Sequence, residues 1–183
     1  MRTFIGVKLS PTPALRRLHD RLAGLGDRFT PVSLSNLHVT LKFLGETTPA
    51  QVPEIGTVLA RIVAGESPTH FQLLGLGAFP NERRPTVVWV GLDQADALQR
   101  IAARLEADLV PLGFAPEGRA FQPHLTLLRV KLRPPDELFS ILADEAHTDF
   151  GMFELARVSL FESELTRSGS RYTVLATYAL GQP

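Results

Sequence analysis

Two strand-like segments of the sequence carry the same pattern of polar residues, and this repeat constrains the fold more than any other feature. Residues 37–44 read LHVTLKFL and residues 121–130 read FQPHLTLLRV, so each holds a histidine followed two positions later by a threonine. The helical patterns before Gly26 and Gly113 also resemble each other. Two similar half-domains that face each other would explain such a repeat.

Hydrophobic periodicity predicts a mixture of strands and helices. We expect strands at residues 3–9, 37–44, 71–79, 86–92, 121–130, 153–162 and 172–180. We expect helices at residues 11–25, 49–64 and 93–112, and a helix or an irregular loop at residues 134–146. Because few segments have the length of a β-α-β repeat, this order favours an α+β fold over a doubly wound sheet. Gly75 and Gly77 could mark a bulge within their strand.

The composition excludes several kinds of site and partner. The chain has no cysteine, which removes disulfide bonds, thiolate metal ligands and cysteine nucleophiles. Lysine plus arginine number 19, as do aspartate plus glutamate, so the formal net charge is zero. Proteins that track along a polyanion usually carry a basic surplus. If this chain handles nucleic acid, we therefore expect it to bind a terminus or a nucleotide.

We expect no signal peptide at the start of this sequence. The first residues, MRTFIGVKLSP, form an apolar stretch that is too short and too interrupted for a signal peptide. No segment approaches the roughly 20 apolar residues that spanning a bilayer needs. We expect a cytoplasmic protein with no membrane partner.

Strand alternation places each histidine on the same face as its threonine, because side chains at positions i and i+2 point the same way. His38 therefore shares a face with Thr40, and His124 shares a face with Thr126. The alternate positions should face a hydrophobic core and so hold the register of each strand. These positions are Val39, Leu41, Phe43, Leu125 and Leu127.

Two facing imidazoles suit acid–base cleavage of a phosphodiester. One neutral ring can take a proton from water while a protonated ring supplies one to the departing oxygen. The threonine hydroxyls can donate hydrogen bonds to the non-bridging phosphate oxygens. A catalytic zinc site usually takes three protein ligands, and no such cluster accompanies either motif, so no metal is expected. The other histidines should lie on the surface, namely His19, His70 and His147.

Four segments, in order along the chain, resemble one known family: NLHVTLKFLGE, RRPTVVWVGL, GRAFQPHLTLLRV and LFESELTRSGSRYTVLATYAL. Together they are similar to the bacterial and archaeal RNA 2',3'-cyclic phosphodiesterases. These proteins are also called 2'-5' RNA ligases and belong to the two-histidine phosphoesterase superfamily. The resemblance runs nearly from end to end.

The resemblance implies one bilobal domain over residues 1–183, with two related α+β halves whose antiparallel sheets line a central cleft and whose helices lie outside. It implies hydrolysis of 2',3'-cyclic phosphate ends of RNA to 2'-phosphomonoesters without a metal or cofactor, and 2'-5' ligation in reverse. His38 would be the proton donor to the leaving 3'-oxygen and His124 the proton acceptor that activates water. Thr40 and Thr126 would bind the phosphate. The expected partner of this monomer is an RNA end, for example one derived from tRNA.

Three parts of the sequence hold weaker candidates for substrate binding. Arg129 ends the second motif, as in similar proteins, but alternation points it away from His124 unless the strand bends. Arg119 could bind the RNA end or lie solvated in a turn. The last hairpin could form the rim of the cleft through Arg167, Arg171 and Tyr172.

Alternative functions remain open at this point. Other two-histidine enzymes share the motifs and open a cyclic phosphate on an ADP-ribose derivative or cleave 2'-5' oligonucleotides. A non-catalytic module that binds RNA ends is disfavoured because both histidines and both threonines are intact. An unrelated α+β domain with chance motifs would not explain a match over four segments.

Overall fold

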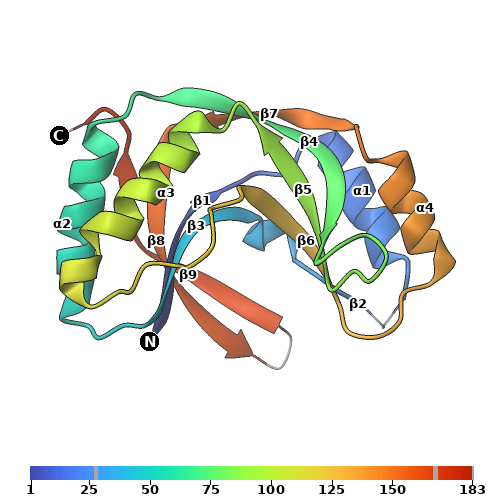
Figure 1. Ribbon diagram of the computed structural model, residues 1–183, viewed down its shortest axis with the longest axis horizontal. Coiled ribbons are helices and arrows are strands. Elements are labelled where there is room, and N and C mark those ends of the chain that lie inside the picture. Colours follow the sequence, from blue (N-terminus) through green and yellow to red (C-terminus); the bar gives the residue numbers. More distant parts are fainter. Residues whose placement is uncertain (27–28, 167–168, 183) are drawn as a thin grey trace.

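One antiparallel sheet runs through the molecule and positions every other element (Figure 1). The computed structural model describes residues 1–26, 29–166 and 169–182. Within them the strands follow the order β7-β4-β5-β6-β3-β1-β8-β9, and β2 pairs with β6 beside this path. The strands are β1 (Arg2–Lys8), β2 (Phe29–Pro31), β3 (His38–Glu46), β4 (Thr69–Phe79), β5 (Val87–Asp93), β6 (His124–Val130), β7 (Asp149–Leu155), β8 (Arg157–Thr166) and β9 (Gly169–Ala179).

The sheet divides at its centre into two lobes, which meet where β3 lies beside β6. Helices pack on both lobes, with α2 and α3 on the lobe of β3 and β9, and α1 and α4 on the lobe of β2, β4 and β7 (Figure 1). The helices are α1 (Pro13–Ala23), α2 (Gln51–Ala64), α3 (Asp96–Asp108) and α4 (Asp136–Asp144), with short 3-10 turns η1 (Leu34–Asn36) and η2 (Val110–Leu112). The expected α+β fold with outer helices is confirmed, and the strands of the two lobes join in a single curled sheet.

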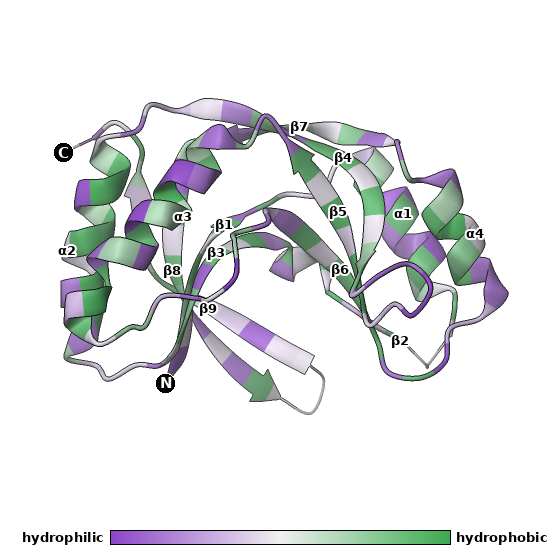
Figure 2. Cartoon of the chain, in the orientation of Figure 1, coloured by the Kyte–Doolittle hydropathy of each residue, from purple (hydrophilic) through white to green (hydrophobic). Residues whose placement is uncertain are grey.

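The helices form where apolar residues recur at helical spacing and a cap starts them. Thr12 caps α1 by accepting a hydrogen bond from the backbone N–H of Leu15 at 3.1 Å, and Pro13 occupies the first turn, where its missing N–H costs nothing. Figure 2 shows hydrophobic and hydrophilic stripes alternating along the helices, as expected when one face packs on a sheet. None of the helices within the described ranges is long and apolar enough to cross a membrane.

Two uncertain predictions about local structure are decided by the fold. Residues 136–144 form a helix, α4, because Leu138, Ile141 and Leu142 bury one face. Gly75 has a φ of 73° at a register shift between β4 and its neighbour β5, so the expected bulge is present. Only glycine adopts that backbone conformation without strain.

Candidate active site

The two histidine motifs meet at the centre of the sheet. Val39 of β3 pairs with Leu125 of β6 in antiparallel register, and both side chains are fully buried. Because opposite residues in such a pair share a face, the positions on either side of each share the other face. The antiparallel direction therefore sets His38 across from Thr126 and Thr40 across from His124. All four polar side chains point to the open face, as the two strand patterns predict.

A bulge follows each motif and changes the alternation. Between β3 and β1, Thr40 pairs with Gly6 and Lys42 pairs with Ile5, so Leu41 is an extra residue. Between β6 and β5, Thr126 pairs with Trp89 and Leu128 pairs with Val88, so Leu127 is an extra residue in the second motif. An extra residue shifts every later side chain to the opposite face of the strand. The two motifs therefore share a matched irregularity three residues after each histidine.

The first bulge makes the predicted burial of Phe43 wrong. Leu41 and Lys42 are both buried, and Phe43 turns out on the histidine face with 61% of its surface exposed. Its ring lies 6.0 Å from that of Phe4, which in turn lies 4.8 Å from the ring of His38. Phe43 therefore offers an exposed aromatic surface beside the site instead of packing in the core.

The second bulge resolves the uncertainty about Arg129. Leu127 and Leu128 are both buried, so Arg129 returns to the face that holds His124. The guanidinium lies close enough to His38 to act on its charge. The strand does bend as the phosphate-binding interpretation of Arg129 requires.

Both histidines are held in the same tautomer by equivalent backbone contacts. Nδ1 of His38 lies 2.6 Å from the carbonyl oxygen of Asn36, and Nδ1 of His124 lies 2.7 Å from the carbonyl oxygen of Gln122. A carbonyl oxygen can only accept, so Nδ1 donates in each case. Nε2 is therefore the nitrogen left to exchange protons with a ligand.

Contacts with other elements hold the segments that precede the two histidines. The side-chain amide of Asn36 donates to the carbonyl oxygen of Ser170 in β9 at 2.7 Å. On the other side, the loop that leads into β6 is held by a fully buried amine on Lys42. Its Nζ lies 2.6 Å from the carboxylate of Glu106 and 3.1 Å from the carbonyl oxygen of Ala115.

His38 sits in an aromatic environment that favours its neutral form. The ring of Tyr172 meets it edge-on at 4.9 Å, and Phe4 and Phe161 stack behind it. Burial lowers the pKa of His38, and the positive charges of Arg129 and His124 lower it further, although the Asn36 carbonyl opposes them. His124 is more open, with Phe79 edge-on at 5.1 Å and Trp89 at 6.4 Å.

The threonine hydroxyls are free to bind a ligand. Across the described part of the chain, neither Thr40 nor Thr126 makes a side-chain hydrogen bond, and both side chains are partly exposed. The open face thus combines two imidazole nitrogens, two hydroxyls and one guanidinium. No trio of His, Cys, Asp or Glu side chains able to hold a metal ion occurs among residues 1–26, 29–166 and 169–182.

The remaining predicted residues have different fates. Arg119 is exposed in the loop before β6, and no described contact joins it to either histidine. Tyr172 does contact His38, whereas Arg171 pairs with Glu164 within the hairpin. Arg167 lies outside the described residues. His70 and His147 are exposed as expected.

His19 contradicts its predicted surface position. Its side chain is only 14% exposed, and Nε2 lies 2.9 Å from the carbonyl oxygen of Val32. The ring projects from α1 onto the segment after β2, a contact that helical periodicity does not show. Sequence reasoning also missed Phe4, Phe79, Trp89 and Lys42, of which only the aromatic residues carried a signal, through their place in alternating strands.

Comparisons with known proteins agree with this geometry. The profile of the family described as LigT-like phosphoesterase matches residues 5–89 and 90–172, one match around each histidine. An Aeropyrum pernix protein named RNA 2',3'-cyclic phosphodiesterase is 39% identical over 88% of this chain and 92% of its own. A Methanothermobacter thermautotrophicus protein of the same name is 32% identical over 98% of this chain and 99% of its own.

Solved structures give the same result. Thermus thermophilus TT0787 superimposes with a TM-score of 0.83 and 29% identity, covering 99% of this chain and 98% of its own. Escherichia coli LigT in complex with 3'-AMP superimposes with a TM-score of 0.72 and 27% identity over the same shares. The matched motifs, the fold and the end-to-end identity lead to one conclusion. The chain belongs to the LigT-like phosphoesterase family.

Proposed function

We propose that this protein hydrolyses 2',3'-cyclic phosphate ends of RNA to 2'-phosphomonoesters, with two histidines as acid and base and without a metal ion. The observation that carries the proposal is the antiparallel pairing of the two motifs, which sets each histidine across from the threonine of the other motif. This pairing puts two histidine Nε2 atoms and two free threonine hydroxyls on one face of the sheet. The names of the relatives support the substrate. The 3'-AMP complex of LigT supports nucleotide binding on this fold.

In the proposed reaction, Nε2 of His124 takes a proton from water, whose oxygen attacks the phosphorus. The bond from phosphorus to O3' breaks, and Nε2 of His38 gives its proton to that oxygen. The phosphate stays on O2'. Thr40, Thr126 and Arg129 bind the non-bridging oxygens, where negative charge concentrates in the transition state.

The lowered pKa of His38 fits the role of acid in this scheme. A ring with a lowered pKa releases its proton to the leaving oxygen more readily once it carries one. The bound phosphate is anionic and lies between His38, His124 and Arg129, so it offsets the repulsion that lowers the pKa in the free protein. Substrate binding thus loads the acid with its proton.

The substrate of this proposal is a single RNA end bound by a monomer. A net charge of zero fits recognition of one terminal phosphate instead of a long backbone. Exposed Phe43 provides a surface on which the terminal base can stack. Ends derived from tRNA belong to this class, and the same site would support 2'-5' joining. A cyclic phosphate on another nucleotide is the second candidate, since nothing in the paired motifs reads a base.

The decisive experiment uses a short RNA that ends in 2',3'-cyclic phosphate. We expect a 2'-phosphate product, identified by its resistance to a 3'-specific phosphatase, with rates unchanged in EDTA. A 3'-phosphate product would contradict the assignment of O3' as leaving group. Loss of activity in EDTA that zinc or magnesium restores would contradict the metal-free mechanism, and binding without turnover would favour the non-catalytic module.

A further inference from the structure

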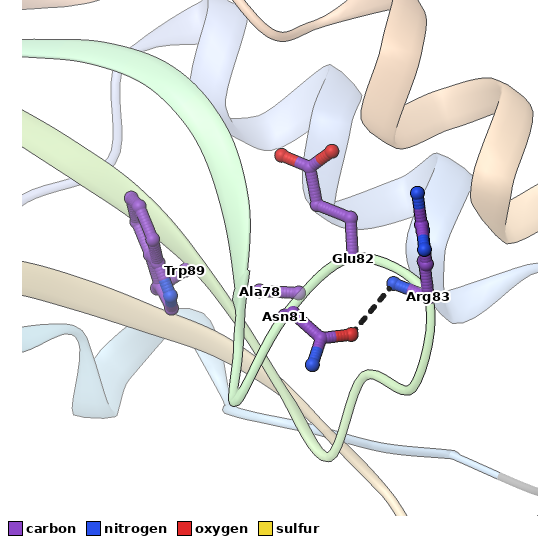
Figure 3. A pocket seen from close by; sticks show the side chains of 5 residues that line it. All are labelled: Ala78, Asn81, Glu82, Arg83 and Trp89. Carbon is purple, nitrogen blue, oxygen red and sulfur yellow. Dashed lines mark hydrogen bonds between the residues drawn. The ribbon is translucent and has the colours of Figure 1, made fainter.

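A hollow beside Trp89 is lined by residues that the proposed hydrolysis does not use. It has a volume of about 480 Å³ and is bounded by Ala78, Asn81, Glu82, Arg83 and Trp89. Figure 3 shows Trp89 on one side and the side chains of the β4–β5 turn on the other. Sites of this size hold ligands as large as a nucleoside. The depression beside His38, which Phe161 and Tyr172 also line, is far smaller, about 20 Å³.

Trp89 connects this hollow to the catalytic face. It pairs with Thr126 across β5 and β6, so its side chain lies on the histidine face, 6.4 Å from the ring of His124. Its ring lies across Gly77 of β4, where a Cβ atom would come within 2.4 Å of the indole. The glycine therefore gives the indole room to lie over β4, with one side toward His124 and the other toward the turn.

The turn supplies polar groups that match a nucleoside followed by a phosphate. Oδ1 of Asn81 accepts hydrogen bonds from the backbone N–H groups of Arg83 and Arg84, which fixes the shape of the turn. In the described part of the chain no carboxylate forms an ion pair with Arg83, so its guanidinium is available to a phosphate. Glu82 offers an acceptor for the amino group of a base. Trp89 and Phe79, whose rings are 5.1 Å apart, offer a stacking surface.

The chemistry of the site decides which nucleoside this would be. The leaving O3' belongs to the nucleoside on the His38 side, and an in-line attack brings the nucleophile from the opposite side, that of His124. We propose that the hollow lined by Trp89 and Arg83 binds the nucleoside whose 5'-hydroxyl takes the place of water, so that the enzyme joins two RNA ends through a 2'-5' linkage. This inference rests on the proposed function and extends it to a second RNA end.

The joining step balances with the same two histidines. The 5'-oxygen of the acceptor bonds to phosphorus and its proton goes to Nε2 of His124. The bond between phosphorus and O3' breaks, and O3' takes a proton from His38. The product is a 2'-5' phosphodiester with a free 3'-hydroxyl, and no oxidant or other co-reactant is needed. Water and the acceptor therefore compete for the same position beside His124.

Direct binding tests the site without catalysis, because Trp89 is the only tryptophan in the chain. The probe is the dinucleotide ApA with a free 5'-hydroxyl, added in inorganic phosphate, which occupies the anion position between the histidines. We expect ApA to quench the fluorescence of Trp89, in the wild type and equally in inactive His38→Ala. Arg83→Ser should weaken ApA binding by roughly threefold or more, in line with one exposed charge contact. The neighbour Arg84 does not line the hollow, so Arg84→Ser should bind as the wild type does.

Partitioning tests the consequence for the reaction. With 2',3'-cyclic AMP and increasing ApA, the ratio of 2'-5'-joined product to 2'-AMP measures acceptor against water. We expect Arg83→Ser to lower this ratio while hydrolysis of 2',3'-cyclic AMP alone stays within about twofold of wild type. Trp89→Leu should lower the ratio about fivefold or more, the effect of losing one stacked base.

The outcomes separate this inference from the proposed function. If ApA does not quench Trp89, or if Phe43→Ala weakens its binding and Arg83→Ser does not, the acceptor site is elsewhere and the inference is wrong. If hydrolysis proceeds and the ratio is the same in Arg83→Ser and Trp89→Leu as in wild type, the inference also fails while the hydrolytic function stands. Binding of ApA by a protein that opens no cyclic phosphate would overturn the proposed function and leave a nucleoside-binding site.

Discussion

Burial lowers the pKa of His38, and the guanidinium of Arg129 on the neighbouring central strand lowers it further. Arg129 reaches this position only because the bulge at Leu127 turns its side chain to the histidine face. Arg129, which we propose binds the phosphate, therefore also lowers the pKa of His38, the proposed proton donor. Four predictions about the central site and one about its support follow from these contacts.

Replacing either His38 or His124 by Ala should lower kcat for 2',3'-cyclic AMP by at least about a hundredfold, since each removes one partner in proton transfer. Circular dichroism and the urea midpoint should show an intact fold, because neither ring is fully buried. His70→Ala is the matched control, as His70 is exposed near the start of β4. Near-normal turnover in either active-site variant would rule out paired acid–base catalysis.

Removing the charge of Arg129 should raise the pKa of His38 toward its ordinary value. In Arg129→Gln the burial of His38 persists, so the pKa stays below 6.5 but moves upward, as followed by NMR titration of the imidazole C2 proton. The limb of the kcat/KM profile governed by His38 should move to higher pH, while a lost phosphate contact lowers its height. Arg133→Gln, in the loop after β6, controls for a general change in charge. An unchanged His38 titration would contradict the proximity of these two residues.

Stability should depend on pH through His38. Its pKa is lower in the folded protein than the ordinary value of 6.5 in the unfolded chain, so the unfolded state binds more protons in this window. As far as His38 is concerned, the free energy of unfolding therefore keeps its full value above about pH 6.5. It decreases as the pH drops from there toward the lowered pKa of His38 in the folded protein. His38→Gln should lose less stability than wild type between pH 8 and pH 5.5 in urea titrations. Parallel losses in both proteins would assign the effect to other groups.

The bulge in β3 can be tested by comparing two apolar truncations. Leu125→Ala should lower the free energy of unfolding by about 2–5 kcal/mol, because it opens a cavity in the core. Phe43→Ala should cost less than about 1 kcal/mol, since Phe43 is 61% exposed, and should instead raise KM for an RNA end. A large loss of stability in Phe43→Ala would mean that the ring packs in the core, as simple alternation predicts.

The ion pair of Lys42 and Glu106 should respond unequally to removal of its two partners. Lys42 is 0% exposed and Glu106 is 26% exposed, so Glu106→Gln leaves a charge that water cannot reach. We expect that variant to lose on the order of 3 kcal/mol, and Lys42→Met to lose less. Arg61→Met breaks the exposed pair with Asp108 and should cost under about 1 kcal/mol. Equal losses of stability in Glu106→Gln and Lys42→Met would contradict the idea that the deeper burial of Lys42 decides the cost.

Much of the fold follows from local patterns. The three regular helices and six of the strands (β1, β3, β4, β5, β6 and β9) were predictable because their apolar residues recur at fixed spacing. The single strand expected at residues 153–162 was wrong, since the chain breaks at Ala156 into β7 and β8, which lie toward opposite ends of the sheet. The short strand β2 is only three residues long, which is too short for an alternating pattern to reveal it. It is defined by its pairing with β6. His19 was misplaced for a related reason, because its partner is a backbone carbonyl on another segment.

The sequence by itself determined which groups are available and how each His-x-Thr pair shares a strand face, since that depends only on the period of a strand. Only the tertiary structure decided that the two strands pair with each other at Val39 and Leu125. It also decided that bulges at Leu41 and Leu127 turn Phe43 and Arg129 toward the site. A bulge is a mismatch between two paired strands, so neither strand encodes it in its own alternation. The tautomer of each histidine likewise depends on the folded backbone, which brings the carbonyl oxygen two residues earlier within hydrogen-bond distance of Nδ1.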